Sequence, residues 1–149
     1  MYPYVLGLHN IVRWLVLLAG AWIVVLAWRG WLGKGRWTAT EDRATRAFTG
    51  MLDFQFLIGL SLYLVFSPLT RSAFADMGSA MRDAPIRYFL VEHPTLMVAA
   101  VAIAHVGAVK VRRSMGDAEK FQRAAIWFGL ALAIVIGFTP WARPMVPSF

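Results

Sequence analysis

The fold is decided by Arg87-Tyr-Phe-Leu-Val-Glu-His-Pro-Thr-Leu-Met-Val-Ala-Ala-Val-Ala-Ile-Ala-His105, a stretch long and apolar enough to cross a lipid bilayer as a helix. It nevertheless carries Glu92, His93 and His105, with Pro94 directly after the first histidine. Ionisable residues inside a spanning helix are energetically costly and tend to mark functional sites. The histidines of this stretch are therefore the first candidates for a site.

The composition of the chain indicates an integral membrane protein. Of its 149 residues, 59% are hydrophobic and only 15% are charged, which is too apolar for a soluble domain of this size. The absence of cysteine excludes disulfides, thiolate metal sites and covalent haem attachment through cysteine. The net charge of +7 falls in short segments between apolar runs. That placement favours a role in membrane orientation and predicts a lipid bilayer, not nucleic acid, as the partner.

Four apolar runs are predicted to span the bilayer, at about residues 5–28, 48–66, 86–109 and 124–141. Short connections between them predict an all-α fold, an integral membrane up-and-down four-helix bundle in a single transmembrane domain. Gly30, Gly33 and Gly35 are expected to break the first helix, and Thr40-Glu-Asp to cap the second.

Residues 69–83 fit two interpretations. Leu69, Ala73, Met77 and Met81 recur every fourth position, which is typical of a short amphipathic helix on the membrane surface. A plain surface loop is the alternative.

Basic residues predict the orientation of the chain. Lys and Arg concentrate in the first and third connections, with fewer in the second connection and only Arg143 in the tail. By the positive-inside rule, both termini then lie outside and the two basic connections lie in the cytoplasm. We expect the membrane to be the bacterial inner membrane.

The polar residues of the spans fall into two predicted layers. Spans one and three run in the same direction, and a rise of about 1.5 Å per residue puts His9 roughly 6 Å and His93 roughly 10 Å inside the outer end. His105 lies roughly 18 Å deeper than His93 and on another face of the helix. Asp53 enters from the cytoplasmic end and is expected to share the inner layer with His105.

Two imidazoles at one depth on two helices can supply both axial ligands of a b-type haem. The sequence predicts that His9 and His93 bind one haem iron near the outer surface, with Arg13 paired to a haem propionate. Pro94 frees the carbonyl of Leu90 and bends the helix, which presents His93 inward. In the alternative interpretation, His9 is an interfacial residue and His93 bonds a neighbouring helix.

The remaining charged residues also have two interpretations each. Arg13 and Glu92 are expected to form an ion pair between spans one and three, and in the alternative Glu92 donates a proton to a bound quinone. Asp53 is expected to be satisfied by a basic connection residue or a backbone donor. A proton-handling pair between Asp53 and His105 is the alternative. Gln55 lies about 200° around the helix from Asp53, and we expect it to serve a different contact.

Three motifs carry a family resemblance: Leu8-His-Asn-Ile-Val-Arg-Trp14, Glu92-His-Pro94 and Pro140-Trp-Ala-Arg-Pro144. They resemble motifs of small bacterial four-helix integral membrane proteins that are labelled cytochrome b-like. The resemblance extends over nearly the whole chain and implies a membrane haem protein. The chain departs from the two-haem cytochrome b pattern, in which two helices each carry two histidines. One bis-histidine haem is therefore the most that this sequence allows.

The predicted function is electron transfer through haem b, by a subunit rather than by a stand-alone enzyme. The alternative is a cofactor-free accessory subunit of a larger respiratory or photosynthetic membrane complex. Both hypotheses require other membrane subunits as partners. A third hypothesis is a proton-coupled carrier that uses Asp53, Glu92 and His105, although the sequence shows no inverted repeat to support it.

Overall fold

The computed structural model describes residues 1–141, and this part of the chain contains helices and no strand. Four helical segments are long and apolar enough to cross a membrane: Tyr2–Leu32, Ala39–Phe66, Ala84–Arg112 and Asp117–Gly137, with 31, 28, 29 and 21 residues. A spanning helix needs about 20 residues. The all-helical class and the four helices long and apolar enough to cross a membrane are therefore confirmed for the described residues.

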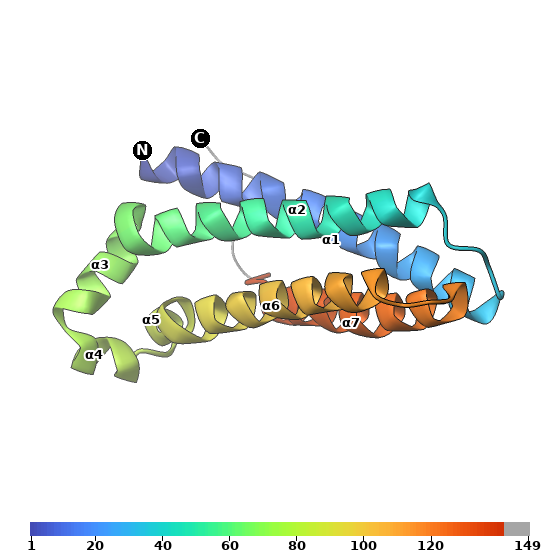
Figure 1. Ribbon diagram of the computed structural model, residues 1–149. Helices are drawn as coiled ribbons and strands as arrows, with labels where there is room; N and C mark the ends of the chain where they lie inside the picture. The colour runs from blue at the N-terminus through green and yellow to red at the C-terminus, as the bar shows by residue number, and fades with distance from the viewer. Residues whose placement is uncertain (142–149) are drawn as a thin grey trace.

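The four long helices lie side by side (Figure 1). α1 (Tyr2–Leu32) packs against both α2 (Ala39–Ser61) and α7 (Asp117–Gly137), and α6 (His93–Arg112) packs against α7. α2 and α6 also touch, over a smaller area. Of the neighbouring pairs of long helices, α2 and α6 therefore make the smallest contact.

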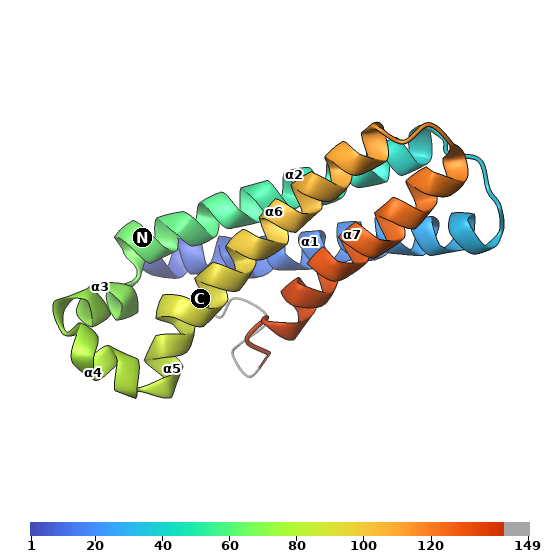
Figure 2. The same ribbon diagram turned by 60° about the horizontal axis from the view of Figure 1, so that its bottom comes forward.

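The two ends of this arrangement differ (Figure 2). Connections 33–38 and 113–116 meet at one end, which we call the loop end. The short helices α3 (Pro68–Ala75), α4 (Met77–Arg82) and α5 (Ala84–Arg87) lie at the opposite end, which we call the short-helix end. The N-terminus also lies at the short-helix end.

The helices do not coincide with the predicted apolar spans. α2 begins at Ala39 and α7 at Asp117, several residues before the predicted starts at 48 and 124, because their first turns are polar and extend beyond the apolar runs. α7 ends at Gly137, before the predicted end of the fourth span at about 141. Residues 142–144 of the closing proline–tryptophan motif, with Arg143, lie outside the described residues.

The sequence prediction of where α1 ends and α2 begins is also corrected. Gly30 lies within α1, and a Cβ there would collide with the Phe121 ring. Close packing therefore explains this glycine, and the helix ends only at Leu32. Thr38, rather than Thr40, caps α2: its hydroxyl accepts from the Thr40 amide at 3.2 Å, and its own amide donates to the Glu41 carboxylate at 2.8 Å. This is a capping box.

Residues 69–83 are mainly helical, so their helical character is confirmed and the loop alternative is wrong. The predicted single helix is broken at Asp76, which caps α4 by accepting from the Ser79 amide at 3.0 Å. Asp83 caps α5 in the same way, accepting from the Ile86 amide at 3.0 Å. Aspartate competes for backbone amides, so it starts new helices in place of continuing old ones.

Two π-helical turns adjoin the short helices. η1 (Leu62–Phe66) ends the second long helical segment, and η2 (Tyr88–Glu92) comes directly before α6. Pro94 has no amide hydrogen to donate back into the helix, and the carbonyl of Leu90 accepts instead from the Tyr63 hydroxyl of η1 at 3.0 Å. The predicted effect of Pro94 on Leu90 is thus accompanied by a hydrogen bond between the two π-helical turns.

The centre of the loop-end half of the helices is filled by interlocking side chains and glycines. Phe48 and Phe128 are fully buried and meet edge to face with ring centroids 6.0 Å apart. A Cβ at Gly107 would lie 2.5 Å from Cβ of Trp127, so α6 and α7 are in very close contact there. Close backbone approach at small residues is the main source of helix association in lipid.

Candidate functional site

A cavity of about 680 Å³ lies between α1, α2 and α6 towards the short-helix end. Its volume falls within the range of roughly 300–1,000 Å³ that small-molecule and cofactor sites occupy. Most of its lining is apolar, with Val16, Leu52 and Met97 among the residues that form it. His9 and His93 both line this cavity. The structure therefore brings together the two histidines that the sequence predicts to act as a pair.

His93 is held in a defined orientation by its surroundings. Its Nδ1 lies 2.9 Å from the carbonyl oxygen of Phe138, just after the end of α7. A carbonyl can only accept, so Nδ1 carries the proton and donates. The Tyr88 hydroxyl donates to the same carbonyl at 2.6 Å, and the Tyr88 and Phe89 rings lie 5.9 and 6.3 Å from the imidazole. In the neutral ring this leaves the lone pair on Nε2.

His9 lies in the second turn of α1, and its ring packs against α2 at a glycine. A Cβ at Gly59 would lie 3.2 Å from Cε1 of His9. The backbone carbonyl of His9 accepts from Gln55 Nε2 at 3.0 Å. Nδ1 of His9 and Oε1 of Gln55 are both buried and make no hydrogen bond within residues 1–141. Buried polar atoms are nearly always partnered, so two such atoms beside one cavity require an explanation.

Arg13 also lines the cavity and is itself buried, one turn after His9. Its Nη1 reaches Oδ1 of Asn10 at 3.5 Å, and its guanidinium lies 6.0 Å from the Trp14 ring centroid. Arg13 is within electrostatic range of both imidazoles, and the two imidazoles are within range of each other. A permanent positive charge beside two imidazole rings in an apolar cavity favours a ligand that carries negative charge.

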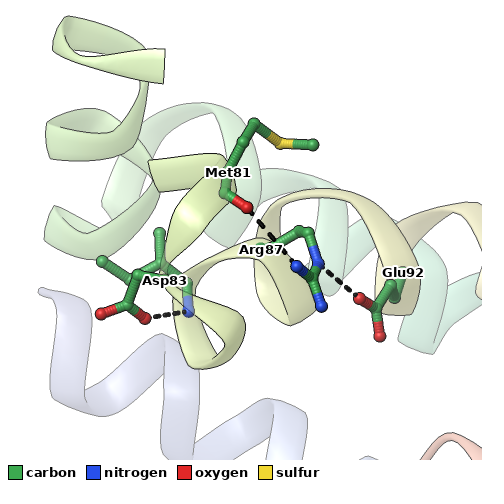
Figure 3. A network of polar contacts seen from close by, with 5 residues as sticks. Met81, Asp83, Arg87 and Glu92 are labelled. Carbon is green, nitrogen blue, oxygen red and sulfur yellow. Dashed lines mark hydrogen bonds and ion pairs between the residues drawn. The ribbon is translucent and has the colours of Figure 1, made fainter. Parts of the chain in front are cut away.

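Glu92 does not form the expected pair with Arg13. Its carboxylate accepts from Arg87 Nε at 3.0 Å, and the same guanidinium reaches the Met81 carbonyl at 3.4 Å (Figure 3). The physical reason is η2: a π-helical turn bonds residue i to i+5, which brings positions 87 and 92 onto one face. Both side chains are 41% exposed, so the pair lies at the rim and not in the cavity.

Asp53 and His105 form the pair that the sequence offered as the alternative. Nε2 of His105 lies 2.7 Å from Oδ1 of Asp53, so the expected basic or backbone partner of Asp53 is wrong. The two side chains are 51% and 45% exposed and bridge α6 to α2. His105 thus faces away from the cavity, as its angular offset from His93 predicted. Gln55 does serve a different contact from Asp53, the carbonyl of His9.

Several residues of the site were not predicted from the sequence. Tyr63, Tyr88 and Phe138 position His93 or its helix through hydrogen bonds between distant segments. Of these additional residues, Gln55 alone has a signal in the sequence, because a polar amide within a spanning helix usually has a structural or functional partner. The role of Gly59 depends on which ring it faces, and no local pattern could reveal that.

Within residues 1–141, no group of three or more His, Asp or Glu side chains could hold a metal ion by itself. A haem iron has four ligands from its own ring, so the two histidines are a sufficient protein ligand set. No model of a known protein family, no curated protein and no solved structure matches this chain.

Proposed function

We propose that this protein is a bacterial inner-membrane electron carrier that binds one haem b between His9 and His93. The single observation that carries the proposal is that both histidines line the same largely apolar cavity of about 680 Å³. Apolar surroundings with a few convergent polar groups are typical of cofactor sites. Bound haem would supply one-electron redox chemistry.

The hydrogen bond of His93 supports its proposed role as a ligand of the haem iron. Metal-binding histidines usually donate their other ring N–H to a carbonyl or carboxylate, which fixes the tautomer and the ring orientation. Nδ1 of His93 makes such a bond to the Phe138 carbonyl at 2.9 Å. The role of α7 is thus to orient His93 through the carbonyl that follows its last turn.

The buried edge of His9 supports its role as the second ligand. His9 makes no side-chain hydrogen bond within the described residues, and its Nδ1 is buried. Ligation through one ring nitrogen would give this imidazole a partner that the described chain does not provide. Gln55 holds the α1 backbone at His9 through its 3.0 Å bond to the carbonyl, which positions the ring.

Arg13 has the charge and the place to bind a haem propionate. It is buried on the cavity wall beside both histidines, and Arg binds carboxylates in a bidentate manner. The apolar lining of the cavity would exclude water from the ring and so affect its potential. Electrons would enter and leave through partner subunits, because the described chain has no soluble domain.

The proposal includes an up-and-down four-helix bundle with both termini outside. The placement of both basic connections at the loop end supports it. Reporter fusions at Gly35 and Gly116 should read cytoplasmic, and a fusion after Phe149 should read external. The opposite readings would contradict the proposed orientation and would show that the cavity lined by His9 and His93 lies near the cytoplasm.

Absorption spectroscopy of the gently purified protein tests the haem. We expect a Soret band and low-spin bis-histidine bands that sharpen on reduction. His9→Ala and His93→Ala should each abolish the low-spin spectrum, while His105→Ala, a matched histidine on the same helix as His93, should retain it. A protein with no Soret absorbance, even after expression with added haem, would reject the proposal and favour the cofactor-free accessory subunit.

A further inference from the structure

A second cavity, of about 430 Å³, lies at the loop end of the seam between α2 and α6. It is separate from the histidine cavity and shares no lining residue with it. Three cationic side chains line it, one from each neighbouring helix: Arg46 of α2, Arg112 of α6 and Lys120 of α7. The hydroxyl-bearing side chains of Thr45 and Thr49 line the same cavity. We call it the basic pocket.

The three cations of the basic pocket have no ion-pair partner within residues 1–141. Other basic residues nearby are engaged: Arg123 pairs with Glu119 and donates to the Lys110 carbonyl at 3.1 Å, and the Lys110 ammonium lies 5.4 Å from the Trp127 ring. The cations of the basic pocket are therefore available to an external anion.

The acidic groups near the basic pocket are already bonded to other residues. Asp42 lines the pocket, but its Oδ1 accepts from Trp37 Nε1 at 2.8 Å. His105 forms the inner limit of the pocket and is bonded to Asp53. Three cationic side chains and one carboxylate, that of Asp42, therefore line the pocket, and their net charge is positive.

Thr45 adds an observation that does not depend on charge. Its hydroxyl oxygen is buried and makes no hydrogen bond within the described residues. A hydroxyl beside cations is a common part of phosphate sites, because it donates to the oxygens that the cations neutralise. The inner wall of the pocket is apolar, formed in part by Ala108 and Val111.

We propose that the basic pocket binds a phosphate group at the membrane interface. The pocket lies at the ends of spanning helices, where lipid headgroups lie, and basic pockets between such helices bind anionic lipid headgroups. The cations contact the phosphate, and the apolar inner wall accepts the start of an acyl chain. The same phosphate chemistry could come from an anionic phospholipid or from a soluble phosphate. This site is independent of haem.

Native mass spectrometry of the detergent-purified full-length protein tests the proposal. The protein is titrated with phosphatidylglycerol and, separately, with zwitterionic phosphatidylcholine. We expect the first phosphatidylglycerol to bind at least about tenfold more tightly, since each Lys or Arg near an anionic surface contributes about 1 kcal/mol. The pocket variant R46Q/R112Q/K120Q should lose that preference. The control variant R36Q/R43Q/R113Q removes three positive charges from the same end, outside the pocket, and should keep it.

The outcomes separate the ligand sources and can overturn the site. If excess inorganic phosphate leaves phosphatidylglycerol bound, the ligand is a lipid; if inorganic phosphate binds the wild type and displaces the lipid, the ligand is a soluble phosphate. Equal losses in the two triple variants would show general charge attraction and reject the pocket. Equal binding of the two lipids, with no phosphate binding, would also reject it. If the pocket variant does not fold, the single variants R112Q and R113Q make the same comparison.

Discussion

The two ends of the long helices use the same residue types for opposite purposes. At the loop end, the glycines of α1 and α6 are covered by aromatic side chains, as at Gly30 and Phe121. At the short-helix end, Gly59 of α2 faces the ring of His9, and the space beyond is the cavity of about 680 Å³. The first arrangement closes the space beside these glycines, and the second leaves space beside Gly59 for a ligand.

The difference shows how a small membrane protein can contain a cavity at all. Lipid is as apolar as the helix interior, so helices associate through close packing and hydrogen bonds and not through a hydrophobic force. The packed half around Phe48 and Phe128 supplies that contact. Hydrogen bonds across the cavity half, such as Tyr63 to Leu90, hold the helices there without filling the space between them.

Truncating one phenylalanine in each half should give the largest contrast. Phe128→Ala removes a fully buried ring from the packed half and should lower the free energy of unfolding by about 3–5 kcal/mol through the void it leaves. Phe56→Ala enlarges a cavity that already exists and should cost less than about 1 kcal/mol. Unfolding in mixed detergent measures both. Equal losses would contradict the division into a packed half and an open half.

Adding a methyl group where α6 meets α7 should have the next largest effect. In Gly107→Ala the new Cβ would lie 2.5 Å from Cβ of Trp127. Because that atom is next to the backbone, the helices must separate, at a cost of about 1–3 kcal/mol. Gly129→Ala on α7 has no such neighbour within 4 Å and should be neutral or stabilising by up to about 1 kcal/mol. Similar destabilisation in both variants would exclude close packing as the cause.

The Asp53–His105 pair, which joins α2 to α6, should contribute less to the free energy of unfolding than the packing contacts do. We expect a coupling of about 0.5–1 kcal/mol between Asp53→Asn and His105→Gln in a double-mutant cycle of unfolding. Half of each side chain is already exposed, which limits the gain from pairing. Additive effects would show that the 2.7 Å contact contributes no stability.

The smallest effect on stability should come from Gly59→Ala, in the open half. The new Cβ would lie 3.2 Å from Cε1 of His9, and the ring can move into the cavity, so unfolding should change by less than about 0.5 kcal/mol. Haem content per protein should nevertheless fall, because a displaced imidazole is a poorer ligand. Gly50→Ala on the same helix has nothing within 4 Å and is the matched control. Unchanged haem content in Gly59→Ala would show that haem binding does not depend on the position of the His9 ring beside Gly59.

The sequence predicted the helices well because their signals are local. Apolar runs of bilayer length located all four spans, and the periodicity of residues 69–83 indicated a helix there. The predicted bounds failed where a helix extends beyond its apolar run, as in the first turns of α2 and α7. The start of α2 is set by the capping box of Thr38 and Glu41. The sequence prediction placed this cap at Thr40 instead.

For the candidate site, the sequence identified residues better than partners. His9, Arg13 and His93 do line one cavity, because depth along two parallel helices follows from the rise per residue. Glu92 was assigned to Arg13 because the two charges lie in the same predicted layer, whereas the π-helical turn η2 brings Arg87 and Glu92 onto one face. Asp53 was assigned to the basic connections, although His105 is its partner.

By itself, then, the sequence determined the apolar helices, the layer in which each polar residue lies, and the position of Pro94 behind His93. Those properties depend on composition and on distance along one helix. Only the tertiary structure decided which faces meet: that Phe138 orients His93, that Gly59 admits the ring of His9, and that the α2–α6 seam is polar. Such contacts join residues far apart in the chain, and they depend on helix rotation and packing, to which small local changes such as a π-helical turn contribute.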